Sequence, residues 1–233
     1  MIKFENTEVM GWEHAIRGMR NPLNSHERSD SGYCMDTLAC HTCKGNRNNC
    51  KKNIDNHKFI IGPNDFDLMK RLSNAGADHR KFMRMITVYV DITAPLYWWK
   101  EFDTYKVGTV ANSCSTMHKI HAKEFTLEDF SCEHLIDDEA IPTRVYSALD
   151  MMEATIENFN YLRELYLETK DKKYWWQIIQ LLPSSYNQKR TVMLNYEVLA
   201  NIYKSRMNHK LDEWSVGFID WIKTLPYHEL ITG

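Results

Sequence analysis

Apolar and polar side chains alternate most regularly in residues 84–95, RMITVYVDITAP. The apolar residues Ile86, Val88, Val90 and Ile92 recur at every second position, which is the period that places side chains on one face of a strand. The segment therefore predicts a strand with one buried face.

Apolar residues three and four positions apart predict helices in other parts of the chain. The longest predicted helix is residues 141–170, with a single apolar seam that would pack internally or pair with another subunit: Val145, Leu149, Met152, Ile156, Phe159 and Leu162. A shorter helix is predicted at 93–106, with Thr93 as a possible cap and Pro95 in its first turn. Its apolar residues cover much of its circumference and predict that it is mostly buried: Leu96, Trp98, Trp99 and Phe102.

Proline, glycine and short polar residues mark the ends of the remaining elements. Residues 62–76 are predicted as a helix that begins near Pro63, with Asn64 and Asp65 as candidate caps, and ends at Gly76. The other predicted elements are a strand at 1–10, helices at 11–20, 173–181 and 211–223, a turn-rich connector at 182–190, and a segment at 191–206 that is helical in its later part. Together they predict an α+β fold, a helix-rich body around a small sheet, in one domain.

Composition is that of an ordinary globular protein. The 233 residues are 43% apolar and 26% charged, which is enough for a sizeable core. The formal net charge of −2 argues against a polymeric nucleic acid as partner, since proteins that bind it nonspecifically usually carry an excess of basic residues. No apolar run reaches the ~18 residues that a membrane helix needs, and the N-terminus lacks the apolar stretch of a signal peptide. We therefore expect a cytoplasmic protein without a membrane partner.

Four of the six cysteines fall in an irregular segment at about 31–57: Cys34, Cys40, Cys43 and Cys50. In an intracellular chain, clustered cysteines favour a metal over disulfides, and four thiolates complete a tetrahedral zinc shell. One pair alone has the two-residue spacing of a zinc knuckle, so a structural zinc site, a redox pair and unliganded thiols all stay open. A second group, His118, His121, Cys132 and His134, lacks a carboxylate partner and is not favoured as a metal site.

Residues 104–119, TYKVGTVANSCSTMHK, form a polar stretch after the predicted buried helix. The stretch and its surroundings resemble the flavin-dependent thymidylate synthases over three blocks: residues 15–20, 79–117 and 182–214. The segment at about 31–57 falls outside the resemblance and looks like an insertion into a single domain of residues 1–233. The resemblance implies a homotetramer that binds FAD and transfers a one-carbon unit from methylenetetrahydrofolate to C5 of dUMP, with NADPH as the reductant.

The resemblance also implies roles for individual residues. Arg206 matches the family's pyrimidine-contacting arginine, and Cys114 stands where the family has a reactive-loop serine; both are the candidate catalytic residues. Implied cofactor-binding residues are His79, Lys81, Thr104, Tyr105, Lys106, Asn112, Asn195 and Asn201. Implied substrate-binding residues are Glu101, Phe102, Thr104, Asn112, Ser113, Cys114, Ser115, Thr116 and Arg206.

The polar stretch departs from the family pattern of Arg-His-Arg, two residues and then Ser. The chain has Thr104, Tyr105, Lys106 and Thr109 at these positions, so two guanidinium groups are replaced by a hydroxyl and an ammonium. Arginine offers phosphate a planar fork of donors, whereas lysine offers one compact charge. Asn112 replaces the family's Glu and Thr116 its next Arg, and the arginine expected before the Leu-Pro turn is absent near residues 179–180.

Simpler roles stay open for several of these residues. Arg206 near a helix end would interact with the helix dipole, and Asn195 and Asn201 would cap a helix or lie on its surface. Cys114 would be a small buried side chain or, beside Lys106, a nucleophile. The whole chain then has three candidate functions: a thymidylate synthase-like enzyme, a related enzyme that modifies C5 of another pyrimidine nucleotide or forms a hydroxymethyl product, and an oligomeric protein without catalysis.

Overall fold

The computed structural model describes residues 2–33, 59–137 and 146–233. The chain divides into two compact units. Unit 1 comprises Met1–Glu5, Asp91–Tyr105 and Ala111–Val192, and unit 2 comprises Asn6–Val90, Lys106–Val110 and Met193–Gly233. The one-domain organisation expected from the sequence stays a prediction.

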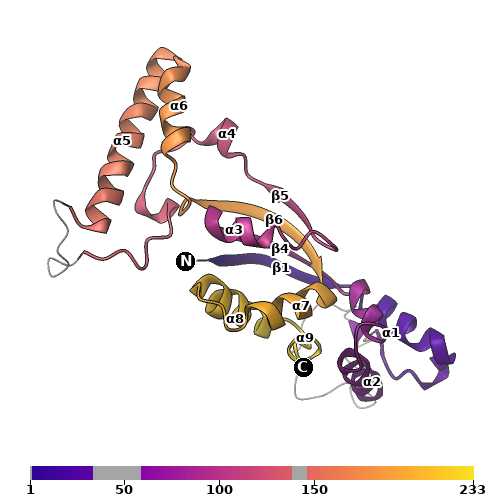
Figure 1. Ribbon diagram of the computed structural model, residues 1–233. Coiled ribbons are helices and arrows are strands. Elements are labelled where there is room, and N and C mark those ends of the chain that lie inside the picture. Colours follow the sequence, from indigo (N-terminus) through magenta and orange to yellow (C-terminus); the bar gives the residue numbers. More distant parts are fainter. Residues whose placement is uncertain (1, 34–58, 138–145) are drawn as a thin grey trace, which may run out of the picture. The chain divides into compact units, whose positions relative to one another are not determined.

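The main sheet has four strands in the order β1-β4-β6-β5 (Figure 1). They are β1 (Lys3–Met10), β4 (Thr87–Pro95), β5 (Val110–Ser113) and β6 (Asn187–Asn195). Strand β4 is the strand predicted from alternation, and its inward residues are buried as expected: Val88, Val90, Ile92 and Ala94. The predicted start at residue 84 was wrong, because residues 84 and 85 end a 3₁₀ helix.

Strands β4 and β6 run antiparallel. At one end the Tyr196 N–H donates to the Ile86 carbonyl at 3.1 Å, and at the other end the Leu96 N–H donates to the Tyr186 carbonyl at 3.0 Å. As the residue number rises in one strand it falls in the other, which is the antiparallel pattern. Since β6 begins at Asn187, the prediction of a turn-rich connector over 182–190 was wrong for its last residues. Pairing with β4, which no local pattern encodes, makes these polar residues a strand.

Strand β4 also corrects the start of the next helix. Helix α3 spans Leu96–Phe102, with Pro95 as its N-cap residue and no side-chain cap. The predicted start at Thr93 was wrong, because this residue still belongs to the paired strand. The predicted burial of the helix is confirmed for Trp98, Trp99 and Phe102.

Unit 1 contains a helical hairpin of α5 (Ala148–Thr169) and α6 (Lys172–Leu181), which lie side by side in Figure 1. The buried core beside it consists of Ile120, Phe125, Phe130, Ile156, Phe159 and Ile178, with Met152 and Leu162 packed against it. The α5 seam therefore packs internally. Val145, at the predicted start of this seam, lies outside the described residues.

A capping box begins α5. The Asp150 N–H donates to Ser147 Oγ at 3.0 Å, and the Ser147 N–H donates to Asp150 Oδ2 at 2.9 Å. These two bonds satisfy backbone donors that the first helical turn leaves unpaired. Two short elements, α4 (Thr116–Lys119) and η6 (Leu127–Asp129), complete the helical part of this unit.

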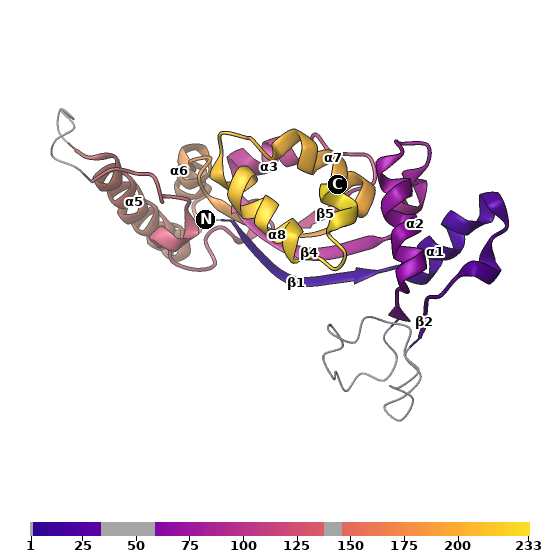
Figure 2. The ribbon, with the colours of Figure 1, turned by 90° about the horizontal axis from the view of Figure 1, so that it is seen from below.

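Unit 2 is built from helices around a buried aromatic and methionine core. Its helices are α1 (Trp12–Arg20), α2 (Pro63–Asn74), α7 (Tyr196–Arg206), α8 (Ile219–Thr224) and α9 (Glu229–Thr232), with the 3₁₀ helices η1 (Asn21–Leu23), η2 (His26–Arg28) and η5 (Arg80–Met85) and the π-helix η7 (Glu213–Phe218). Figure 2 shows α1 beside α2, which contact each other. The largest fully buried side chains of this unit are Trp214, Tyr196, Phe218, Met69 and Met83.

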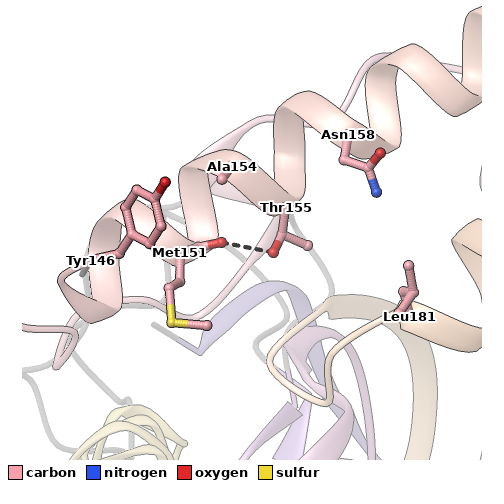
Figure 3. Close-up of a pocket in the computed structure, with 6 residues that line it drawn as sticks. All are labelled: Tyr146, Met151, Ala154, Thr155, Asn158 and Leu181. Carbon is pink, nitrogen blue, oxygen red and sulfur yellow. Dashed lines mark hydrogen bonds between the residues drawn. The ribbon is translucent and has the colours of Figure 1, made fainter. Parts of the chain in front are cut away.

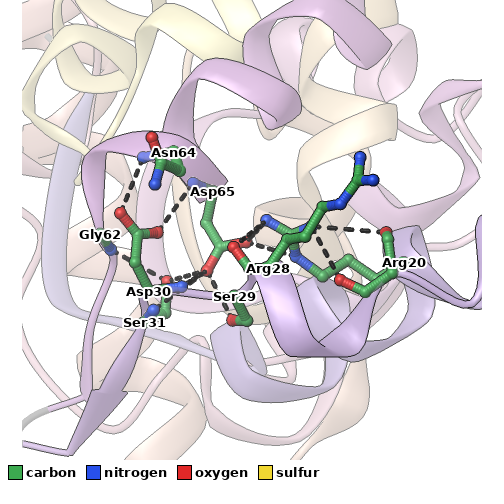
Figure 4. Close-up of polar contacts among 9 residues, drawn as sticks. Arg20, Arg28, Ser29, Asp30, Ser31, Gly62, Asn64 and Asp65 are labelled. Carbon is green, nitrogen blue, oxygen red and sulfur yellow. Dashed lines mark hydrogen bonds and ion pairs between the residues drawn. The ribbon is translucent and has the colours of Figure 1, made fainter.

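A buried ion pair organises the start of α2 (Figure 4). Arg20 Nε donates to Asp65 Oδ1 at 2.6 Å, and Asp65 Oδ2 accepts from the hydroxyls and N–H groups around Ser29 and Ser31. The predicted capping roles of Asn64 and Asp65 were wrong, because the Asp30 carboxylate instead accepts from the N–H groups of both residues. Asp65 is fully buried, so its charge is stabilised by Arg20 and these donors rather than by water.

The same network holds the two strands that flank residues 34–58. Strand β2 (Gly32–Tyr33) pairs antiparallel with β3 (Phe59–Ile60), and the Gly62 N–H donates to Ser31 Oγ at 2.9 Å. The four cysteines of the predicted zinc site lie outside the described residues. No helix in the described part of the chain is both long enough and apolar enough to cross a membrane.

Candidate functional site

The start of helix α7 forms the first part of the candidate site, in unit 2. Asn195 is the N-cap residue, and its Oδ1 accepts from the Val198 N–H at 3.0 Å. Gly108 lies directly against this turn with a φ of +76°. A Cβ built on it would lie 2.9 Å from Asn195 Nδ2 and 3.0 Å from Val198 Cγ2. The backbone of residues 106–110 therefore approaches α7 as closely as a residue without a side chain allows.

A cluster of charged residues forms where η5 meets the first two turns of α7. Arg84 Nε donates to Glu197 Oε2, and Arg84 Nη2 lies 3.4 Å from Glu197 Oε1. Arg80, one turn earlier in η5, has its Nε 3.5 Å from the same Glu197 oxygen and its Nη2 donating to Asn201 Oδ1 at 2.8 Å. Two guanidinium groups thus share one carboxylate, and one of them also fixes the orientation of the Asn201 amide.

Electrostatics within this cluster favour the charged forms. The hydrogen bond and the attraction of the Glu197 carboxylate raise the pKa of Arg84 above its ordinary value, so the guanidinium stays protonated. Glu197 is buried, which would be unfavourable for a lone carboxylate but is offset here by two cations.

The other residues implied in unit 2 lie on exposed or half-buried surfaces. His79 is exposed at the N-cap position of η5, and Lys81 is exposed within 4.0 Å of the Asp78 carboxylate. Arg206 lies in the last turn of α7, with its guanidinium carbon 4.8 Å from the centre of the Trp214 ring. The guanidinium therefore lies over a fully buried ring, where it makes a cation–π contact. Its place in the last turn of α7 also puts a positive charge at the negative end of the helix dipole.

In unit 1, strand β6 makes hydrogen bonds to a residue just before the polar stretch and to a residue within it. Arg190 Nη1 donates to Asp103 Oδ1 at 2.7 Å, and the guanidinium carbon lies 4.2 Å from the centre of the Trp99 ring. Arg190 Nε also donates to Gln188 Oε1 at 3.0 Å, and Gln188 Nε2 donates to the Cys114 carbonyl at 3.0 Å. Asp103 immediately precedes the stretch and Cys114 lies within it, just after β5, so one strand contacts the chain at both places.

Five of the residues predicted to bind substrate, 112–116, lie beside the contact between Gln188 and Cys114. Asn112, Ser113, Cys114 and Ser115 are exposed along or just after β5, and Ser115 caps α4 by accepting from the His118 N–H at 3.1 Å. Thr116 follows in α4 and is half-buried.

The residues at the end of α3 divide into buried and exposed groups. The Phe102 ring is 2% exposed and packs on Trp98 and Trp99, so its side chain belongs to the core. Glu101 is half-buried, and its carbonyl accepts from Thr104 Oγ1 at 2.7 Å. Tyr105 is half-buried, with its ring centroid 6.5 Å from that of Phe102, whereas Lys106 is exposed.

Sequence reasoning missed four charged residues that the structure brings into these arrangements, namely Arg80, Arg84, Glu197 and Arg190. The pair of arginines four positions apart at 80 and 84, just before the best strand, was a visible signal that both would extend from one face of a helix. Their partner Glu197 is 113 positions away from Arg84, and no local pattern predicts that pairing.

No group of metal-ligating side chains occurs within residues 2–33, 59–137 and 146–233. The two thiols described are the exposed Cys114 and the half-buried Cys132, whose pKa is raised by burial. A hollow of about 360 Å³ lies on the helical hairpin, and Figure 3 shows its lining: Tyr146, Met151, Ala154, Thr155, Asn158 and Leu181. The lining of this hollow carries no carboxylate, imidazole or cation. A second hollow, of about 250 Å³, does have such groups in its lining, among them Glu13, Arg17, Arg20 and His26.

No family model and no curated protein matches the sequence. Solved structures do match. The crystal structure of thymidylate synthase X (ThyX) from Helicobacter pylori with FAD and dUMP gives a TM-score of 0.63 at 14% identity, covering 100% of this chain and 96% of that chain. A second structure of flavin-dependent ThyX from Helicobacter pylori, complexed with FAD and dUMP, gives 0.61 at 15% identity and covers 99% and 96%. The likeness shows a shared fold, which confirms the predicted helix-rich α+β class with a small antiparallel sheet.

Proposed function

We propose that this chain is a flavin-dependent thymidylate synthase-like enzyme, which transfers a one-carbon unit from methylenetetrahydrofolate to C5 of dUMP. The observation that carries the proposal is a fold match over the full chain to two structures that hold FAD and dUMP. The resemblance of residues 79–117 and 182–214 to the same family supports it from the sequence side. A likeness of fold alone does not specify chemistry, so the proposal depends on what the residues around α7 and β6 can do.

One feature near α7 fits a flavin nucleotide. Arg80 Nε is buried without a hydrogen-bond partner among the described residues, although Glu197 lies 3.5 Å away. We propose that Asn195, Asn201 and the exposed Lys106 contact the flavin, with His79, Lys81 and residues 104, 105 and 112 around it. Bound FAD would supply the hydride that the transferred carbon needs, with NADPH as the source.

Arg206 is proposed to hold the uracil ring. A nucleophilic C5 requires stabilisation of the negative charge that develops on the ring, and a fixed guanidinium supplies this stabilisation. The Arg206 guanidinium carbon lies 4.8 Å from the centre of the buried Trp214 ring, and this contact restricts the side chain before a ligand binds. The hydroxyls, amide and backbone of residues 112–116, with Glu101, residue 102 and Thr104, are proposed to contact the rest of the nucleotide. Cys114 is a candidate catalytic residue because its thiol is exposed.

Titration of the purified protein with FAD tests this proposal, followed by incubation with dUMP, methylenetetrahydrofolate and NADPH and mass analysis of the nucleotide. We expect a bound flavin spectrum and a product heavier by one methylene unit. A protein that stays colourless and leaves flavin fluorescence unchanged would contradict the proposal. Arg206→Ala should lower dUMP affinity without removing flavin, because its role is limited to the ring.

A second enzymatic function is favoured by the residues at 104–106, where hydroxyl, phenol and ammonium groups stand in place of the family's guanidinium, imidazole and guanidinium. A changed set of phosphate donors is expected where the natural substrate is another pyrimidine nucleotide. The same assay distinguishes the two functions, since a hydroxymethyl product is heavier than a methyl product by one oxygen atom. If Arg206→Ala changes no ligand affinity at all, the third candidate, a binding or structural protein without catalysis, is favoured.

The homotetramer, the zinc site at Cys34, Cys40, Cys43 and Cys50, and the cytoplasmic location stay predictions. Metal analysis of the purified protein tests the zinc site directly, with one zinc ion per chain as the expected result.

A further inference from the structure

The cluster at Arg80, Arg84 and Glu197 carries more positive than negative charge. Two guanidinium groups face a single carboxylate, and the fourth member of the cluster, Asn201, is a neutral amide. A buried carboxylate is fully compensated by one arginine, so the second guanidinium exceeds what Glu197 needs. An excess positive charge at a half-buried position favours an anion.

Arg84 is accessible enough to meet such an anion. Its side chain is 58% exposed, and its contacts to Glu197 use the Nε and Nη2 atoms. Arginine has five N–H donors in a planar fork, so donors remain after a bidentate contact to one carboxylate. Arg80 is 14% exposed and has a buried Nε that lacks a hydrogen-bond partner within the described chain. A bound anion would offer acceptors to the guanidinium donors that Glu197 leaves open on both arginines.

The position of the cluster connects it with the loop of residues 106–110. Glu197 and Asn201 are four positions apart on α7, and Val198 and Asn201 are three apart, so the three side chains occupy adjacent strips of one helical face. Gly108 lies against Val198, and Arg80 is bonded to Asn201. The guanidinium cluster and the loop that carries Lys106 therefore meet at the first two turns of the same helix.

We propose that Arg80 and Arg84 form a phosphate-binding site, with Glu197 as their shared counter-ion, and that its ligand is the diphosphate of FAD. The inference rests on the proposed function. It assigns phosphate recognition to two arginines of η5, whereas residues 104–106 provide one ammonium. Guanidinium groups bind phosphate oxygens through paired, charge-assisted hydrogen bonds, and Glu197 competes with the ligand for these donors.

Flavin titrations test this assignment. The unaltered chain and Arg84→Gln are each titrated with FAD and with riboflavin, which has the same ring but no phosphate. We expect Arg84→Gln to weaken FAD binding about tenfold, the value of one charge-assisted bond, and to leave riboflavin binding unchanged. Arg71→Gln is the matched control, because Arg71 is also an exposed arginine paired with a carboxylate, Asp67 at 3.1 Å, on α2.

Glu197→Gln is expected to change FAD affinity in the opposite direction from Arg84→Gln. Removing the carboxylate releases two guanidinium groups from their counter-ion, so FAD and inorganic pyrophosphate should both bind more tightly. Thermal unfolding of each variant shows whether the fold survives, and Arg84→Gln is expected to survive because its side chain is largely exposed.

The outcomes distinguish a failure of the phosphate site from a failure of the proposed function. If the unaltered chain binds FAD and both variants bind it with the same affinity, the phosphate site is wrong and the proposed function stands. An equal loss of FAD and riboflavin in Arg84→Gln also overturns the phosphate site, because it indicates a structural effect. If the unaltered chain binds neither flavin, the proposed function fails and this inference fails with it.

Discussion

At the scale of single residues, Gly108 determines how closely the loop of residues 106–110 approaches α7. Its φ of +76° disfavours any residue with a Cβ, and that Cβ would lie 2.9 Å from Asn195 Nδ2. We expect Gly108→Ala to lower the free energy of unfolding by more than the ~1–2 kcal/mol of left-handed backbone strain, measured by urea denaturation.

Gly76→Ala is the control for that substitution. Gly76 also has a positive φ, +104°, but a Cβ there would meet nothing within 4 Å. The difference between the two variants isolates the contact with Asn195. Equal losses of stability would show that this contact contributes nothing and that the loop can move away from the helix.

Asp65 makes the stability of the N-terminal region depend on pH. Burial opposes ionisation of its carboxyl group, but hydrogen bonds from Ser31 and Ser29 and the Arg20 guanidinium together lower the pKa below its ordinary value. A lowered pKa in the folded state stabilises the protein above the unfolded-state pKa of about 3.9, and this stabilisation is lost as the pH falls through the folded-state pKa. The free energy of unfolding should therefore decline below about pH 4.

Asp65→Asn should remove this part of the acid dependence. It should also reduce stability by about 3–5 kcal/mol at neutral pH, because Arg20 keeps its buried charge without a counter-ion. Asp67→Asn changes an exposed carboxylate on the same helix and should lie within about 0.5 kcal/mol of the unaltered chain. An unchanged acid transition in Asp65→Asn would show that other carboxyl groups control it.

At the scale of elements, β6 contacts the chain just before the polar stretch, at Asp103, and within it, at Cys114, through Arg190 and Gln188. Arg190→Met should remove the bond to Asp103 and the stacking on Trp99, and should lower the free energy of unfolding by about 2 kcal/mol. Amide hydrogen exchange should then become faster at residues 103–105 and 112–114, because the guanidinium connects the end of α3 to the Gln188–Cys114 contact.

Arg190→Lys is the matched variant, since it keeps the charge but loses the planar fork that reaches two acceptors at once. We expect it to retain stability better than Arg190→Met while still loosening residues 112–114. Exchange rates that stay unchanged in both variants would show that backbone bonds, such as the one from the Cys114 N–H to the Lys189 carbonyl at 2.9 Å, hold the strand alone.

At the scale of the whole molecule, self-association is expected through the helical hairpin. The α5 seam is used inside the chain, yet Tyr146, Met151 and Leu181 are 63%, 63% and 55% exposed around the hollow of Figure 3. Clustered exposed apolar side chains commonly mark contacts between proteins. Sedimentation should therefore detect an oligomer, and a Met151→Ser, Leu181→Ser double variant should shift it toward smaller species.

Glu153→Ser controls for that double variant, because Glu153 is exposed on the same helix. A similar shift in the control would point to a loss of helix stability instead of a lost interface. Should the unaltered chain sediment as a monomer at every concentration, the tetramer expected from the family resemblance would be wrong.

The local pattern of residues was sufficient for much of the fold. Strand β4, helices α1, α5 and α6 and the α+β class follow from periodicity and from helix-ending residues, because each depends on neighbours within a few positions. The helix-cap role that the sequence left open for Asn195 is also local, and the structure has it. The likeness of the fold to the two solved structures could likewise be expected from the order of three sequence blocks.

Contacts between distant residues could be decided by tertiary structure alone. Strands β5 and β6 are polar segments that become strands by pairing with each other and with β4. The sequence predicted Asp65 as a helix cap, whereas in the structure its carboxylate pairs with Arg20, 45 positions away. The ion pairs of Arg84 with Glu197 and of Arg190 with Asp103 join residues 113 and 87 positions apart. Periodicity describes which face a side chain occupies, whereas the partner on that face is set by how the whole chain folds back on itself.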